Sequence, residues 1–126
     1  MSNAVLDQRF AFLGFSSSDR ERLRGLKPLV EQHLPEILDA FYADIAEHDE
    51  VSRLFEDEEM RRHARDKQLE HWLCICDAEY GERYLSSVRR IGETHARLGL
   101  SPAWYFGGYS KIVSGLVKAI ARAKIV

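Results

Sequence analysis

The sequence predicts an all-α fold, and three observations support this. Apolar residues recur at intervals of three and four along every long segment, which is the spacing of one face of a helix. No segment shows the strict alternation of a half-buried strand. Serine, proline and glycine also lie at positions typical of helix starts and ends.

Composition limits the class of protein. The chain has 126 residues, enough for one domain, with 45% apolar and 30% charged residues. Its 18 basic and 20 acidic residues are interspersed and give a net charge of −2, which argues against nucleic acid or a membrane as a partner. No signal peptide precedes residue 15 and no apolar run is long enough to span a bilayer, so we expect a cytoplasmic protein.

The N-terminal part divides into a lead-in helix and the first core helix. We expect one domain over residues 1–126, with the lead-in helix at 1–17 and the core at 18–126. Ser18 and Glu21 fit a capping box, Pro28 fits the first turn of a new helix, and Pro35 predicts a kink or restart. The stripe that this region buries consists of Val30, Leu34, Leu38, Phe41, Tyr42 and Ile45.

Three further helices follow a short acidic segment at residues 48–59, whose apolar anchors are Leu54 and Phe55. The first buries Met60, Ala64, Gln68, Trp72 and Ile75, with His71 beside Trp72. The second buries Tyr84, Val88, Ile91, His95 and Leu98, and Gly99 is its expected C-terminal cap. Pro102 begins the last helix, in which Tyr105, Tyr109, Ile112, Leu116 and Ile120 are expected to face inward, with Phe106, Val113 and Val117 on a second flank.

Polar residues on apolar stripes are the candidates for function. His95, Tyr42 and Gln68 lie on the inward faces of three different helices, and a buried polar group without a partner costs roughly 1–3 kcal/mol. A central ligand with a metal and a hydrogen-bonding face would satisfy all three, although a histidine on such a face is also commonly a core residue. If one ring nitrogen of His95 binds that metal, we expect the N–H of the other ring nitrogen to donate a hydrogen bond to the Ile91 carbonyl.

Other chemistry receives less support from the sequence. His71 and Cys74 are spaced for a zinc site, but no second pair of ligands accompanies them. Cys74 and Cys76 lie on opposite sides of one helix and are expected to be inert thiols. The absence of Cys-x-x-Cys-His excludes covalent c-type haem attachment.

A longer pattern resembles the globin-coupled sensor and protoglobin family. The pattern runs from His71-Trp72 and Tyr84 through Ile91-Gly92…His95-Ala-Arg-Leu-Gly-Leu100 to Pro102-Ala-Trp104-Tyr105…Gly108-Tyr109, with Phe41-Tyr42 upstream. The resemblance implies an all-α, globin-like fold of the sensor type. It also implies a further long helix after the one that begins at Pro102, which this sequence lacks. We therefore expect self-association through the last helix and an attached signalling output domain.

The resemblance also implies a haem b cofactor and a site for it. His95 would be the proximal iron ligand, and Tyr42 the distal hydroxyl that donates to dioxygen or another diatomic gas. The other residues expected at the haem are Phe41, Phe55, Gln68, His71, Trp72, Val88, Ile91 and Tyr105. His71 would reach a propionate or the haem edge, and Lys67 and Arg97 are further propionate candidates, although both fit an exposed charged face.

The implied function is a haem-based oxygen sensor domain without catalytic activity of its own. Two alternatives stay open. One is a haem-free globin-fold interaction module, which His95 and Tyr42 argue against. The other is a haem enzyme that oxidises nitric oxide or consumes peroxide, for which the sequence has no reductase and no distal His–Arg pair.

Overall fold

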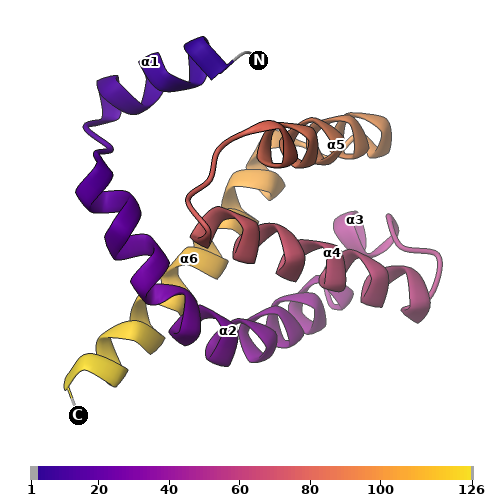
Figure 1. The fold of residues 1–126 in the computed structure, drawn as a ribbon. Coiled ribbons are helices and arrows are strands. Elements are labelled where there is room, and N and C mark those ends of the chain that lie inside the picture. Colours follow the sequence, from indigo (N-terminus) through magenta and orange to yellow (C-terminus); the bar gives the residue numbers. More distant parts are fainter. Residues whose placement is uncertain (1–2, 126) are drawn as a thin grey trace.

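Helices make up the fold over residues 3–125, which are the residues described by the computed structural model (Figure 1). No strand occurs within this range, so the predicted all-α class is confirmed. The helices are α1 (Asn3–Leu13), α2 (Ser17–Ala46), α3 (Asp49–Ser52), α4 (Glu58–Cys76), α5 (Glu82–Leu98) and α6 (Pro102–Ile125).

The start of α2 differs from the prediction by two residues. Ser16 is the N-cap: its hydroxyl accepts a hydrogen bond from the Asp19 amide, and the Asp19 carboxylate accepts one from the Ser16 amide. The predicted capping box of Ser18 and Glu21 is therefore wrong. Three consecutive serines offer the same cap chemistry. The backbone conformation selects Ser16 as the N-cap, because Ser16 has the extended conformation that an N-cap requires.

Two prolines lie inside α2, which continues through both of them. The expected new helix at Pro28 is wrong, since one helix of 30 residues extends from Ser17 to Ala46. Each proline removes a helical hydrogen bond at a cost of about 3 kcal/mol. Burial of Val30, Leu34 and Leu38 between α4 and α6 offsets that loss. Figure 1 shows α2 changing direction along its course, and a proline inside a helix is a common cause of such a bend.

The core lies where α2 packs against α4 and α6. Leu34, Leu38 and Ile112 are fully buried there, as the predicted stripes require. The other buried members of this core are Val30, Trp72, Cys76 and Leu116. Glycine allows the close approach of α6 to α2, because a Cβ atom on Gly108 would lie 3.0 Å from Cζ of Phe41.

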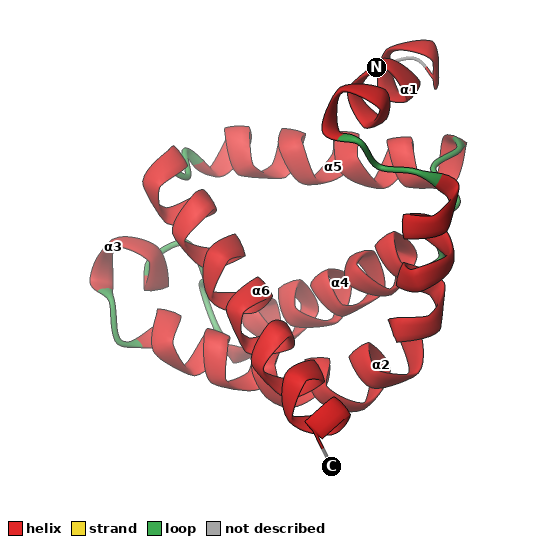
Figure 2. Ribbon diagram, turned by 90° about the vertical axis from the view of Figure 1, so that its left-hand side faces the viewer, coloured by secondary structure: helices red, strands yellow, loops and turns green. Residues whose placement is uncertain are grey.

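Helix α5 lies on the other side of the molecule and packs mainly on α4 (Figure 2). Leu85 is its one buried residue, and its C-cap is Gly99, whose φ of 70° confirms the predicted left-handed cap. The aromatic residues at the start of α6 are more exposed than predicted. Tyr105 is 41% and Tyr109 52% exposed, and the buried residues on the inward face of α6 are Ile112 and Leu116, further along the helix.

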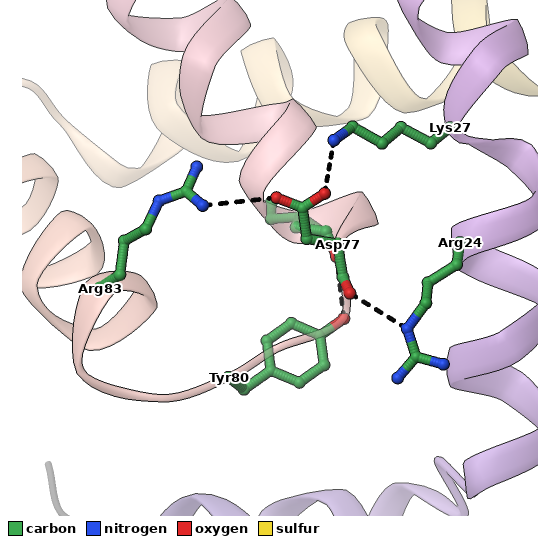
Figure 3. A network of polar contacts seen from close by, with 6 residues as sticks. Arg24, Lys27, Asp77, Tyr80 and Arg83 are labelled. Atoms are coloured by element: carbon green, nitrogen blue, oxygen red, sulfur yellow. Dashed lines mark hydrogen bonds and ion pairs between the residues drawn. The ribbon is translucent and has the colours of Figure 1, made fainter.

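The α4–α5 turn connects three helices through Asp77 (Figure 3). The Asp77 carboxylate pairs with Lys27 of α2 at 2.5 Å and with Arg83 of α5 at 3.5 Å. Its backbone carbonyl accepts a hydrogen bond from Arg24, and the next residue, Ala78, has a positive φ of 55°. Asp77 therefore fixes the point at which α5 leaves α4.

The same turn holds the lead-in helix. The guanidinium of Arg20 lies 5.2 Å from the ring centroid of Phe10, 6.0 Å from that of Phe15 and 5.4 Å from that of Tyr80. These contacts attach α1 to the molecule, while Phe12 on its outer face is 90% exposed. Over residues 3–125 no helix is both long enough and apolar enough to cross a bilayer.

Candidate functional site

The first group of predicted site residues surrounds Tyr42. The Tyr42 hydroxyl donates a hydrogen bond to Oε1 of Gln68 at 3.0 Å, which joins α2 to α4. Phe41 and Phe55 pack edge-on against the Tyr42 ring, with centroid distances of 5.1 and 6.0 Å. Four predicted residues from three segments are thus brought together.

Tyr42 is a hydrogen-bond donor in this setting. Burial raises its pKa to about 12, so the hydroxyl keeps its proton at neutral pH. The amide of Gln68 holds the hydroxyl in one direction, toward the space between α2 and α4. Tyr42 can therefore donate to a polar ligand, and Gln68 is the group with which that ligand would compete.

The second group forms at the α4–α5 contact. Nδ1 of His71 lies 2.8 Å from Oγ of Ser87, and the His71 ring stacks on Tyr84 at 6.2 Å and 18°. Trp72 is buried in the core and contacts the ring of Tyr109 at 5.1 Å. His71 was expected at a haem edge, and here its hydrogen-bond partner is a residue of α5.

His95 forms the third group with Tyr105. The two rings meet edge-on at 4.9 Å, at the C-terminal part of α5 and the start of α6. Burial lowers the pKa of His95, which favours the neutral imidazole that a metal requires. The expected hydrogen bond to the Ile91 carbonyl is wrong for this structure: within residues 3–125 the His95 side chain has no hydrogen-bond partner, since its ring turns toward Tyr105.

Helix α6 contacts residues of all three groups. Gly108 lies one turn after Tyr105, and Phe41 of the first group contacts Gly108. Tyr109 follows directly and meets Trp72 of the second group. One side of α6 therefore passes from the neighbourhood of His95 to that of Tyr42.

The residues between α5 and α6 fit a flat apolar ligand that carries a metal. Val88 and Ile91 are half-buried and share the His95 stripe, while Tyr105 and Tyr109 expose aromatic surface on α6. An imidazole without a hydrogen-bond partner supplies a ligand nitrogen, and the Tyr42 hydroxyl supplies a separate donor. Haem combines an apolar face with an iron atom, so this set of side chains suits it.

Charged residues gather in a cleft that Tyr42 also lines. A cleft of about 520 Å³ opens between α2 and α4, lined by Asp39, Tyr42, Ala43, Ala46, Glu58, Arg61, Arg62, Arg65 and Asp66. Lys67 pairs with Glu70 at 3.7 Å, and Arg97 is exposed. No cluster of three or more His, Cys, Asp or Glu side chains suited to a bare metal ion occurs within residues 3–125.

Ser87 is the residue of these groups that the sequence did not indicate. Its hydroxyl lies on the flank of the α5 stripe, and nothing in its spacing distinguishes it from Ser86. Its contact with His71 spans 16 positions and depends on how two helices pack. Tyr84 and Tyr109 were expected on inward faces, and their ring contacts add them to the same region.

Comparison with known proteins gives two findings. The sequence profile of the Protoglobin family matches residues 2–124. Over 122 residues the chain is 27% identical to the heme-based aerotactic transducer HemAT of Halobacterium salinarum. The match covers 96% of this chain and 25% of that protein, so the chain spans about a quarter of the length of this relative.

Proposed function

Because this chain belongs to the protoglobin family, we propose that it binds haem b and acts as a gas-sensing domain. Dioxygen is the proposed ligand, with nitric oxide and carbon monoxide as further candidates. The single observation that carries the proposal is the half-buried imidazole of His95, which packs edge-on against Tyr105 beside the exposed aromatic face of α6. The name of the halobacterial relative, a heme-based transducer, supports the same cofactor.

The proposed roles follow from the chemistry of each side chain. Bound haem would supply an iron atom with one open position for a diatomic gas. His95 would hold the cofactor through a ring nitrogen, and Val88, Ile91 and Tyr105 would contact the cofactor on this side. Phe41 and Phe55 pack around Tyr42, whose hydroxyl donates to a polar ligand and thereby favours dioxygen over carbon monoxide. Gln68 orients that hydroxyl.

We further propose that the domain signals through other protein segments and has no catalytic activity itself. The exposed outer flank of α6, where Phe106 is 67% and Val117 60% exposed, is the proposed homodimer contact. The halobacterial relative is about four times the length of the matched region, which supports an attached output module.

A haem titration followed by absorption spectroscopy tests the cofactor and its ligand. The wild-type chain should bind one equivalent of haem, and His95→Ala should weaken binding by at least about tenfold, because a metal ligand is lost. His63→Ala is the matched control, since His63 is an exposed histidine of α4. Full haem retention in His95→Ala would overturn the ligand assignment. No haem binding by the wild type would favour the alternative, a haem-free interaction module.

The role of Tyr42 needs a separate measurement. Tyr42→Phe should bind haem normally but release dioxygen roughly fivefold to tenfold faster, as expected for the loss of one hydrogen bond. Carbon monoxide release should change less, because this ligand is a weaker acceptor. Equal effects on both gases would contradict a hydrogen-bonding role for the hydroxyl.

A further inference from the structure

Helix α5 carries His95 but is held by few contacts. Leu85 is the one residue of this helix that is buried. The Asp77 carboxylate reaches the helix at its N-terminal end through Arg83. Beyond that end, the polar contact of α5 with α4 is the hydrogen bond between His71 and Ser87.

The geometry of this hydrogen bond is well defined. His71 and Ser87 are both half-buried, and their side chains meet at 2.8 Å. The His71 ring is also fixed by its stack on Tyr84, which lies one turn before Ser87 on the same helix. The His71 side chain of α4 therefore contacts α5 at two points, by a ring contact and by a hydrogen bond.

Two contact points of this kind fix the rotation of a helix about its axis. At about 100° per residue, Tyr84 lies within roughly 20° of the face that carries His95, and Ser87 lies about 80° from it. Turning α5 so that His95 moves sideways would break the His71–Ser87 bond and unstack Tyr84. His95 lies about 12 Å further along the helix, close enough for a rigid helix to transmit the constraint.

We propose that His71 is a positioning residue, which through Ser87 and Tyr84 sets the rotation of α5 and hence the direction of the His95 ring. The effect of His71 on gas binding rests on the proposed haem function. The effect of His71 on the rotation of α5 does not, since it depends only on contacts between side chains of this chain. The two parts can therefore be tested separately.

The first test uses the full chain without haem and measures hydrogen–deuterium exchange of the α5 amides. Ser87→Ala should speed exchange roughly threefold to tenfold relative to Ser86→Ala, the change expected for one lost hydrogen bond. Ser86→Ala is the matched control because it makes the same change of helix propensity one residue away. Circular dichroism establishes that both variants keep their helix content.

Variants of His71 separate the effect of the hydrogen bond to Ser87 from that of the ring stack on Tyr84. His71→Phe keeps an aromatic ring against Tyr84 but removes the hydrogen bond, so its α5 exchange should match that of Ser87→Ala. His71→Asn keeps a polar atom near the position of Nδ1 and should restore part of the protection. The double variant His71→Phe/Ser87→Ala should exchange no faster than either single variant. Equal exchange in Ser87→Ala and Ser86→Ala, or additive effects in the double variant, would overturn the proposal.

The second test uses the haem-loaded chain and the iron–histidine vibration, which responds to the direction of the imidazole ring. Ser87→Ala and His71→Phe should shift or broaden this band, and Ser86→Ala should leave it unchanged. An unchanged band together with faster exchange in the haem-free chain would refute the link to His95. If the wild type bound no haem, the exchange result would still decide whether His71 positions α5.

Discussion

The two sides of this molecule use apolar residues in different ways. Where α2 crosses α4 and α6, leucine and isoleucine side chains are fully buried, and glycines let the helices approach closely. On the α5 side, an equally regular apolar stripe is mostly half-buried, and it faces aromatic residues of α6 that are exposed. Figure 2 shows α5 along one edge of the molecule, with α2, α4 and α6 grouped below it.

The difference teaches that a regular stripe predicts which face of a helix is apolar, but not what covers it. The core stripe meets other helices of the same chain. The α5 stripe includes a histidine without a hydrogen-bond partner among residues 3–125, which a packed core would not tolerate easily. A bound ligand is the proposed cover on that side.

The largest effect is expected in the core. Leu34→Ala should lower the free energy of unfolding by about 2–5 kcal/mol, because Leu34 is fully buried and its truncation leaves a cavity. Val117→Ala, on the exposed flank of α6, should change it by less than about 0.5 kcal/mol. Urea denaturation measures both. A small effect of Leu34→Ala would mean that the two sides do not differ in packing as described.

Two neighbouring glycines of α6 give the next largest effect. Gly107→Ala should stabilise the chain by about 0.5–1 kcal/mol, since nothing lies within 4 Å of the added Cβ and alanine favours the helix. Gly108→Ala should be roughly 1–3 kcal/mol less stable than Gly107→Ala, because the Phe41 ring must move. Thermal denaturation of the two variants makes the comparison. Equal stability would show that α6 and α2 are not in close contact at this point.

A smaller effect is expected at the turn that joins the two sides. Asp77→Asn removes the charge that pairs with Lys27 and Arg83, and it should lower stability by less than Leu34→Ala does. The loss should shrink in about 1 M NaCl, where the screening length is about 3 Å. Asp39→Asn, which breaks a more exposed pair with Arg65, is the control and should cost less still. A salt-independent loss would contradict an electrostatic role for Asp77.

The smallest effect concerns the histidines of the α5 side. Burial lowers the pKa of both His71 and His95 below the ordinary value of 6.5. As the pH falls through 6.5, the unfolded chain therefore takes up protons before the folded chain does, and stability falls until the pH passes the folded pKa values. Urea midpoints between about pH 8 and pH 5 should decline less steeply in His71→Asn/His95→Asn than in the wild type. An equally steep decline of the urea midpoint in the wild type and the double variant would contradict this prediction.

Much of the fold was predictable from the sequence because helical spacing records which residues are buried together. The stripes of α2 and the later part of α6 were predicted correctly, and so were the cap at Gly99 and the start at Pro102. The N-cap of α2 at Ser16 was not predictable, since any of three consecutive serines could serve as the cap. The continuation of α2 through Pro28 was not predictable either, because the burial of its apolar residues outweighed the tendency of proline to begin a new helix.

The candidate site was only partly predictable. Polar residues on apolar stripes pointed to Tyr42, Gln68 and His95, and two of these three bond to each other in the structure. The contact of His71 with Ser87 depends on the packing of α4 on α5, to which sequence spacing gives no access. The roles of all these residues at a haem remain proposals.

Two buried cysteines make the opening of the last turns of α4 observable in solution. Cys74 and Cys76 are both buried in the last turns of α4, they are the only thiols of the chain, and burial raises the pKa of Cys76. A thiol reagent can therefore reach them only when this part of the core opens, so the labelling rate reports the frequency of opening. The unmodified chain thus carries its own kinetic probe of opening at the C-terminal end of α4.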